Sequence, residues 1–151
     1  MNQSRLTDLA YLIVRVGAGL TLAYYGAQKM FGLFHGPGPT GTIQFMGTMF
    51  GFPSWMAIVA MCGELLGGLG LAFGFLTRIA ALGGACVMFT AAYVGVRDHG
   101  LAAVLLNGKG QEIAQFFYPL SLGVTCVGLL LTGGGAFSLD KFVFGRKKKA
   151  K

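Results

Sequence analysis

Four apolar stretches of about 20 residues each constrain the fold more than any other feature of this sequence. The stretches cover approximately residues 9–34, 55–76, 79–96 and 111–132. An α-helix rises 1.5 Å per residue, so about 20 apolar residues cross the ~30 Å hydrocarbon core of a bilayer. The sequence therefore predicts an all-α, polytopic membrane protein with four transmembrane helices in a bundle, surrounded by the lipid bilayer.

The composition excludes an ordinary soluble domain. Of the 151 residues, 54% are hydrophobic and only 11% are charged, and the mean hydropathy is +0.66. These values are typical of a chain that faces lipid. Because no linker or change of composition divides the chain, we predict one membrane domain over residues 9–141 and a basic tail over residues 142–151.

The formal net charge of +7 comes largely from the tail Arg146-Lys147-Lys148-Lys149-Ala150-Lys151. In a soluble protein this charge would suggest nucleic acid, but beside a membrane segment it indicates topology or a contact with anionic lipid. No nucleic-acid partner is therefore predicted. Four spans place both termini on one side, and basic residues are concentrated there, so we predict that both termini are cytoplasmic.

The segments between the predicted spans are short. Pro and Gly alternate over residues 35–41, which predicts a loop. The apolar segment 43–52 is too short to cross the bilayer, so we expect a brief helix at the interface. Thr77-Arg78 is a very short turn, which makes the second and third spans antiparallel. Pro119 is expected to kink the fourth span.

One acid, Glu64, lies in the middle of the second span. The glycines around it recur at intervals of four, three and four, so they share one helical face. Such a stripe lets another helix approach closely. Glu64 falls beside this stripe on the helical wheel and should point toward a protein neighbour. A carboxylate at this depth costs several kcal/mol unless it is paired or protonated. The stripe consists of Gly63, Gly67, Gly70 and Gly74.

The first span carries two cations on one narrow face, Arg15 and Lys29. Counted from the outer ends of the helices, Arg15 lies about 20 Å deep and Glu64 about 14 Å deep. An Arg side chain covers that difference, so an Arg15–Glu64 pair is predicted in the bundle interior. Lys29 and Glu112 both lie near the outer mouth, which predicts a second pair.

These side chains admit two interpretations. In the first, the ion pairs only lock the bundle together, since buried ionic groups often specify register and nothing more. In the second, they line a polar pocket that opens to the outer side, with Glu64 as a proton relay. Intramembrane ionisable residues favour a functional site. The predicted pocket residues are Arg15, Gln28, Lys29, Glu64, Glu112 and Gln115.

No metal site is predicted. Cys62, Cys86 and Cys126 are isolated in three different apolar segments, which is typical of small buried hydrophobic residues. His35 and His99 both fall at the outer side, but they lack any further ligand pattern and are expected to be surface residues.

The ordered set of motifs along the chain resembles the DoxX family of small bacterial membrane proteins. The first motif is an Arg followed by a Gly-rich helix that ends in Gly26-Ala27-Gln28-Lys29. The others are Gly63-Glu64-Leu65-Leu66-Gly67-Gly68, Gly74-Phe75-Leu76-Thr77-Arg78 and Gly135-Ala136-Phe137-Ser138-Leu139-Asp140. The resemblance runs from about Arg15 to Asp140. The residues that match the family pattern are Arg15, Lys29, Glu64, Arg78 and Asp140.

The resemblance implies four membrane helices in the bacterial inner membrane. It also implies an association with quinone-linked oxidoreductases or with membrane complexes that handle thiol stress. Quinone would then be the ligand, and an oxidoreductase subunit the partner. Many members of the family have no assigned activity, so the resemblance gives none of the matching residues a catalytic role.

Three functions follow from these observations. The first is a membrane subunit of a quinone-linked oxidoreductase, in which Arg or Lys would hydrogen-bond the quinone carbonyls and Glu64 would relay protons. The second is a small-molecule or ion carrier, in which charged pairs open and close a path. The third is an assembly subunit without activity of its own. Gly83 and Gly84 are additional small residues that could pack against another copy, so a homo-oligomer is also considered.

Overall fold

The structure is a computed structural model that describes residues 3–97 and 100–144. Four long helices form a bundle, and each is long and apolar enough to cross a membrane. This confirms the predicted fold class. The four helices are α1 (Gln3–Phe31), α3 (Ser54–Phe73), α4 (Thr77–Arg97) and α6 (Gly110–Thr132).

Shorter elements connect the long helices. After α1 come a 3-10 turn, η1 (Leu33–His35), and the predicted interfacial helix, α2 (Gly38–Phe50). Helix α2 begins inside the segment that was predicted as a loop. Pro39 lies in its first turn, where a missing N–H costs no hydrogen bond.

Two short helices were not predicted from the sequence, α5 (Leu101–Asn107) and α7 (Leu139–Phe144). Both are too short to show a clear hydrophobic period. Helix α6 continues through Pro119 as one helical element to Thr132.

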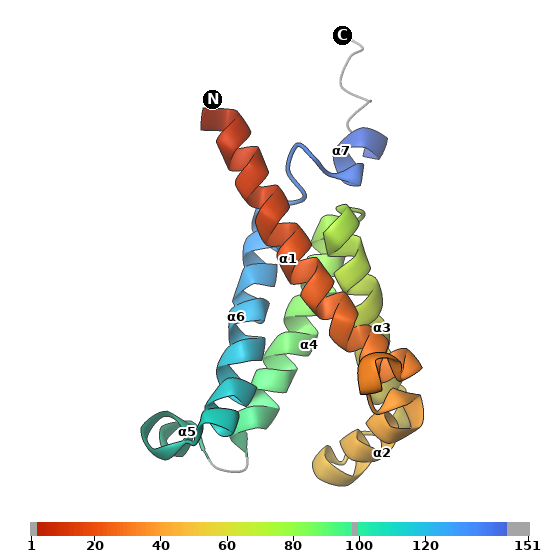
Figure 1. Cartoon of the computed structure of the whole chain (residues 1–151), viewed down its shortest axis with the longest axis vertical. Coiled ribbons are helices and arrows are strands. Elements are labelled where there is room, and N and C mark those ends of the chain that lie inside the picture. The colour runs from red at the N-terminus through yellow and green to blue at the C-terminus, as the bar shows by residue number, and fades with distance from the viewer. Residues whose placement is uncertain (1–2, 98–99, 145–151) are drawn as a thin grey trace.

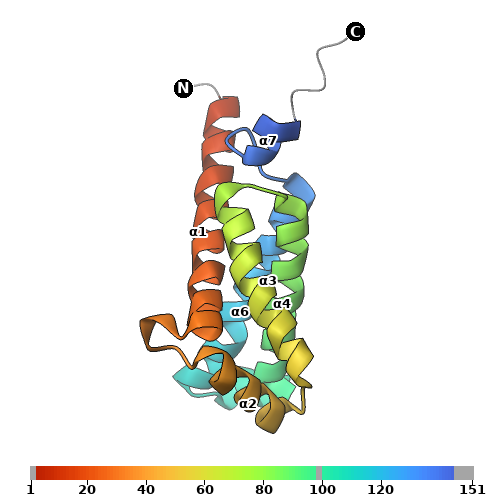
Figure 2. The ribbon, with the colours of Figure 1, turned by 90° about the vertical axis from the view of Figure 1, so that its right-hand side faces the viewer.

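Both described ends of the chain lie at the same end of the bundle, as four spans require (Figure 1). We call this the terminal end; it carries the start of α1, the α3–α4 turn and α7. Helices α2 and α5 lie at the opposite end, which we call the α2/α5 end (Figures 1 and 2).

The four long helices do not pack equally well against one another. Helix α1 packs extensively along α3, and α4 packs extensively along α6, while α1 and α6 make few contacts. A buried apolar cluster closes the middle of the bundle; it contains Ala18, Leu22, Leu71, Ala81, Ala85, Met88, Leu122, Cys126 and Leu129.

Glycines set the register between α1 and α3. A Cβ on Gly26 would collide with the backbone of Leu65, and one on Gly19 would collide with the backbone of Ala72. The backbones therefore touch directly, as small residues allow in membrane helix pairs. Because these two contacts lie seven residues apart on each antiparallel helix, they fix which residues of α1 face which residues of α3.

The glycine stripe of α3 packs mainly on α4. A Cβ on Gly67 or Gly70 would meet Ala80, and one on Gly63 would meet Val87. Glu64 lies beside the stripe and is 1% exposed. The prediction that Glu64 points toward a protein neighbour is therefore confirmed.

Candidate functional site

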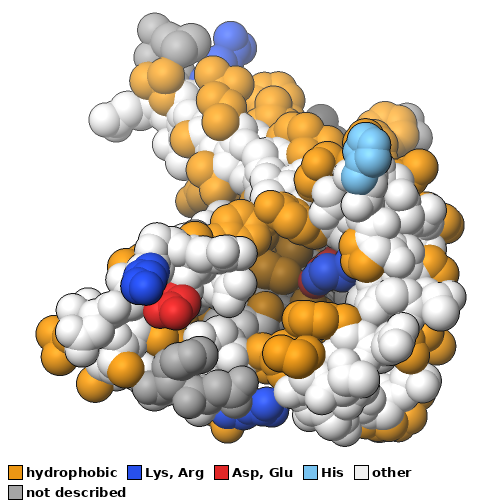
Figure 3. All heavy atoms as spheres, turned by 60° about the horizontal axis from the view of Figure 1, so that its bottom comes forward, with side chains coloured by type: hydrophobic (Ala, Val, Ile, Leu, Met, Phe, Trp, Pro, Cys, Tyr) orange, Lys and Arg blue, Asp and Glu red, His pale blue; other side chains and the backbone are white. Residues whose placement is uncertain are grey.

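A cavity of about 190 Å³ lies between the four long helices. All four helices contribute to its wall, and it lies on the α2/α5 side of the apolar cluster. A space-filling view of that end shows a hollow with apolar walls and with basic and acidic atoms inside it (Figure 3). The lining residues are Leu22, Tyr25, Lys29, Glu64, Met88, Ala91, Gln115, Tyr118 and Pro119.

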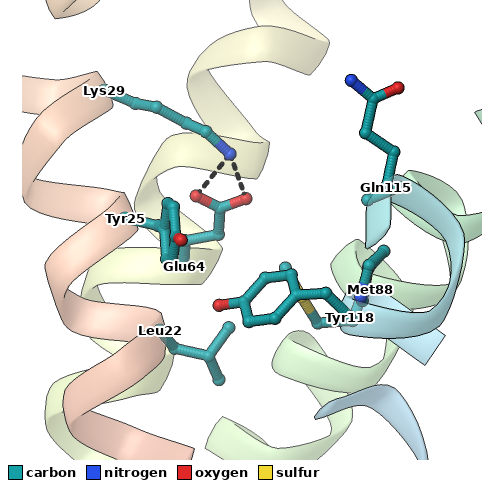
Figure 4. Close-up of a pocket in the computed structure, with 9 residues that line it drawn as sticks. Leu22, Tyr25, Lys29, Glu64, Met88, Gln115 and Tyr118 are labelled. Atoms are coloured by element: carbon teal, nitrogen blue, oxygen red, sulfur yellow. Dashed lines mark hydrogen bonds and ion pairs between the residues drawn. The ribbon is translucent and has the colours of Figure 1, made fainter. Parts of the chain in front are cut away.

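An ion pair between Lys29 and Glu64 forms one side of the cavity (Figure 4). The Lys29 ammonium donates to both carboxylate oxygens, with Nζ 2.5 Å from Oε1 and 2.7 Å from Oε2. The Glu64 side chain is 1% exposed and the Lys29 side chain is 27% exposed. The carboxylate is thus removed from solvent, while the ammonium still faces the cavity.

Two tyrosines and one glutamine complete the polar part of the wall. The rings of Tyr25 and Tyr118 lie 5.4 Å apart between centroids and are tilted relative to each other. Gln115 stands on α6, across the cavity from Lys29 (Figure 4). Leu22, Met88, Ala91 and Pro119 make the rest of the wall apolar. Such a cavity suits a ring-shaped ligand with a hydrogen-bond acceptor.

The predicted Arg15–Glu64 pair is wrong. The Arg15 guanidinium lies near the terminal end, where its Nη2 donates to the Phe137 carbonyl oxygen at 2.9 Å. The glycine contacts place Glu64 opposite residue 27 of α1, which is twelve residues or about 18 Å from Arg15. Counting depths from the helix ends failed because α3 extends beyond α1 at the α2/α5 end: the glycine contacts place Phe31, the last residue of α1, opposite residue 60 rather than opposite Ser54, the first residue of α3.

The predicted Lys29–Glu112 pair is also wrong. Oε2 of Glu112 accepts the backbone N–H of Lys109 at 3.3 Å, so this acid serves the first turn of its own helix. Lys29 is left to pair with Glu64, because the register of α1 and α3 brings their side chains to the same level.

Of the six predicted pocket residues, three line the cavity: Lys29, Glu64 and Gln115. Arg15, Gln28 and Glu112 do not. Sequence reasoning missed the two tyrosines, although the spacing held a signal. Tyr25 precedes Lys29 by four residues and Tyr118 follows Gln115 by three, so each shares a helical face with a predicted pocket residue.

A second polar cluster lies at the terminal end and joins two motifs that are far apart in the sequence. The Asp140 carboxylate accepts the backbone N–H groups of Leu76 and Thr77 at 2.6 and 2.8 Å. The Asp140 N–H donates to the Gly74 carbonyl oxygen at 2.9 Å. Asp140 therefore caps the N-terminus of α4 from a residue more than sixty positions away.

Further contacts hold the segment before α7 against the bundle. Asp8 of α1 accepts the backbone N–H of Ala136 at 3.2 Å. Arg15 is 2% exposed and bonds Phe137 in the same segment. Gly74 leaves the space that the Arg15 guanidinium occupies, because a Cβ there would collide with Nη1. This cluster contributes to the architecture of the terminal end and lies outside the cavity.

Within residues 3–97 and 100–144, no group of three His, Cys, Asp or Glu side chains comes together to hold a metal. His99 lies outside the described residues. The three cysteines are free; Cys126 is buried as predicted, whereas Cys62 is half-buried and Cys86 is exposed, so the expected burial is wrong for Cys86.

The fold and the cavity define a small multi-pass membrane protein with a buried ion pair inside a four-helix bundle. The DoxX family profile matches residues 10–97, and the chain belongs to the DoxX family. This confirms the resemblance that the sequence motifs indicated.

Three bacterial proteins are similar to the chain over nearly its whole length. "Putative oxidoreductase CatD" of Bacillus subtilis (strain 168) is 36% identical over 98% of this chain and 96% of its own length. Inner membrane protein YqjF of Escherichia coli (strain K12) is 30% identical over 92% and 95%. Inner membrane protein YphA of the same strain is 28% identical over 86% and 87%. No solved structure shows a significant match.

Proposed function

We propose that this protein is a membrane subunit of a quinone-linked oxidoreductase in the bacterial inner membrane, and that its cavity binds the quinone head group. The observation that carries the proposal is the Lys29–Glu64 pair. It places an ammonium on the wall of a largely apolar cavity, with a buried carboxylate behind it. Quinone carbonyl oxygens are hydrogen-bond acceptors, and an ammonium is a donor without acceptor capacity.

The remaining wall suits a flat ring. Tyr25 and Tyr118 offer aromatic faces, and Leu22 and Met88 offer apolar contacts. The name of the Bacillus subtilis relative includes the word oxidoreductase, which agrees with this class of function.

Reduction of a quinone to a quinol consumes two electrons and two protons. In this proposal a partner subunit or a donor molecule supplies the electrons. Lys29 hydrogen-bonds the ligand oxygen, and Glu64 relays protons behind it. Lys29 is the more exposed partner, so the pair connects the buried carboxylate to the cavity.

The carrier alternative has less support. A path across the membrane would need to pass from the cavity to the terminal end. The apolar cluster around Leu22, Leu122 and Cys126 occupies the middle of the bundle between these two places. The Lys29–Glu64 pair therefore lines a cavity that the apolar cluster closes on the side of the terminal end.

The function is tested by purifying the protein from its native membrane in mild detergent and extracting bound quinone. Wild-type protein is expected to carry quinone and to co-purify with a partner protein that has redox activity. Lys29→Met should lose the quinone, while Lys109→Met, which removes an exposed lysine outside the cavity, should retain it. Quinone-free wild-type protein that also fails to bind added quinone would refute the proposal. An assembly subunit would instead retain its partner protein in both variants without any quinone.

A further inference from the structure

We infer that the ligand reaches the cavity from within the bilayer, through the seam between α1 and α6. We also infer that it is an amphiphile, with a ring in the cavity and an apolar chain that stays among the lipids. This inference rests on the proposed function for the identity of the ring. The route itself is carried by the packing of the helices.

The first observation is that α1 and α6 close only part of the bundle. Their residues meet in the buried apolar cluster, where Ala18 and Leu22 of α1 join Leu122, Cys126 and Leu129 of α6. Beyond this level the two helices diverge toward the α2/α5 end (Figure 1). The other neighbouring pairs, α1 with α3 and α4 with α6, stay in close contact.

The second observation concerns the side chains at the seam. Tyr25 of α1 and Tyr118 of α6 both line the cavity, and each is 38% exposed. Their rings lie 5.4 Å apart between centroids. These rings therefore stand at the edge of the cavity where α1 and α6 diverge, and a rotation of either side chain would widen the seam without moving a helix.

The third observation is the depth of these rings. Tyr25 lies six residues before Phe31, the end of α1, and Tyr118 lies eight residues after Gly110, the start of α6. At 1.5 Å per residue the rings are about 9–12 Å inward from the helix ends. The interfacial region on one side of a bilayer is only about 5–8 Å thick. The seam therefore faces hydrocarbon chains at the level of the tyrosines.

The volume of the cavity then limits the ligand. A cavity of about 190 Å³ holds a single ring, since about 150 Å³ is enough for benzene in an engineered protein cavity. A chain of many methylenes does not fit beside the ring. Directed into water, such a chain would lose the transfer free energy of each methylene, whereas the seam leads it into lipid. The ring belongs beside Lys29, and the chain passes between Tyr25 and Tyr118.

The test measures access to the cavity directly. In a background with the three native cysteines replaced by alanine, Leu22→Cys places a thiol on the cavity wall. The protein is reconstituted in lipid nanodiscs and labelled with a lipid-soluble maleimide or with a charged, membrane-impermeant maleimide. The lipid-soluble reagent is expected to react at least tenfold faster, after correction for partitioning into the lipid. Met88→Cys, which lines the cavity from α4, serves as a second position in case Leu22→Cys fails to fold.

Widening the seam between α1 and α6 should change only the labelling rate of the lipid-soluble reagent. Tyr118→Ala is expected to accelerate labelling by the lipid-soluble reagent severalfold and to leave the rate of labelling by the charged reagent unchanged. Tyr93→Ala, at an exposed tyrosine of α4 away from the cavity, should change neither rate. Equal rates for the two reagents, or an equal effect of Tyr118→Ala on both, would overturn the lateral route.

A long-chain quinone in the same nanodiscs separates this inference from the proposed function. Protection of the thiol by the long-chain quinone supports both. Lipid-selective labelling without protection by any quinone leaves the route standing and refutes quinone as the ligand. Protection by a chain-less quinone added from water, together with equal labelling rates, supports quinone binding and refutes the lateral route.

Discussion

The ammonium of Lys29 bridges both carboxylate oxygens of Glu64 and thereby joins α1 to α3 at the wall of the cavity. The two partners differ in their access to solvent, since Glu64 is 1% exposed and Lys29 is 27% exposed. This asymmetry has energetic consequences. Removing the ammonium leaves a carboxylate in an apolar bundle, whereas removing the carboxylate leaves a flexible cation near the helix end.

Lys29→Met should therefore destabilise the protein more than Glu64→Leu. We expect a loss of about 2–3 kcal/mol for Lys29→Met, below the value for a fully buried pair because Lys29 is partly exposed. Glu64→Leu should cost about 1 kcal/mol, since Lys29 can extend toward water. The double variant should recover much of the loss. Thermal unfolding in detergent micelles measures all three, and equal losses in the two single variants would contradict the asymmetry.

Gly68→Val should separate α1 from α3. A Cβ on Gly68 would collide with the backbone of Ala23, so the helices must move apart and the Lys29–Glu64 pair loses its register. We expect a loss of several kcal/mol, or no folded protein in the membrane. Gly17→Val is the matched control on α1, because a Cβ at Gly17 meets no atom within 4 Å. Similar melting temperatures for the two variants would show that the close approach is unimportant.

Asp140→Ala should loosen the start of α4. The carboxylate accepts the N–H groups of Leu76 and Thr77, and losing an N-cap typically costs about 0.5–2 kcal/mol. Hydrogen exchange of these two amides should accelerate, and protease should cleave the segment around Gly135 more readily. Exchange near Glu64 should stay unchanged, since the cavity lies toward the other end of the bundle. Asp140→Asn, which keeps one acceptor oxygen, should show an intermediate effect.

The orientation of the protein in the membrane is a further prediction. The terminal end carries Arg5, Arg78 and Lys141 and leads into the basic tail, so we expect both termini in the cytoplasm. The cavity then opens toward the outer leaflet. A reporter enzyme that is active only outside the cytoplasm should be inactive when fused to the C-terminus. The same reporter should be active when it is inserted into the connection that includes His99.

Arg15 shows how far sequence reasoning can lead and where it fails. Its burial was predicted correctly from its place beside Lys29 on one narrow face of the first span, and it is 2% exposed. Its partner was not predicted correctly, because pairing depends on how far two helices are shifted along each other. Counting residues from each helix end assumes that the ends of neighbouring helices lie in one plane, and α1 and α3 do not satisfy that assumption, because α3 begins beyond the last residue of α1.

Asp140, Tyr25 and Tyr118 also make contacts that the sequence could not predict, because these contacts join segments far apart in the chain. The motifs around Gly74 and around Asp140 were both recognised, but nothing in the sequence indicated that they bind each other. The α7 segment folds back over the α3–α4 turn, which brings the Asp140 carboxylate to the N–H groups of α4. Tyr25 and Tyr118 likewise meet only because α1 and α6 converge at the buried apolar cluster.

The sequence by itself determined the number of spans, the burial of Glu64 and the family. These properties depend on the length of each apolar stretch, on helical periodicity and on local motifs, all of which are readable within one segment. Only the tertiary structure decided that Glu64 pairs with Lys29 rather than Arg15. The reason is that glycine contacts between the backbones of α1 and α3 set their register, and a register between two helices is a property of neither sequence segment alone.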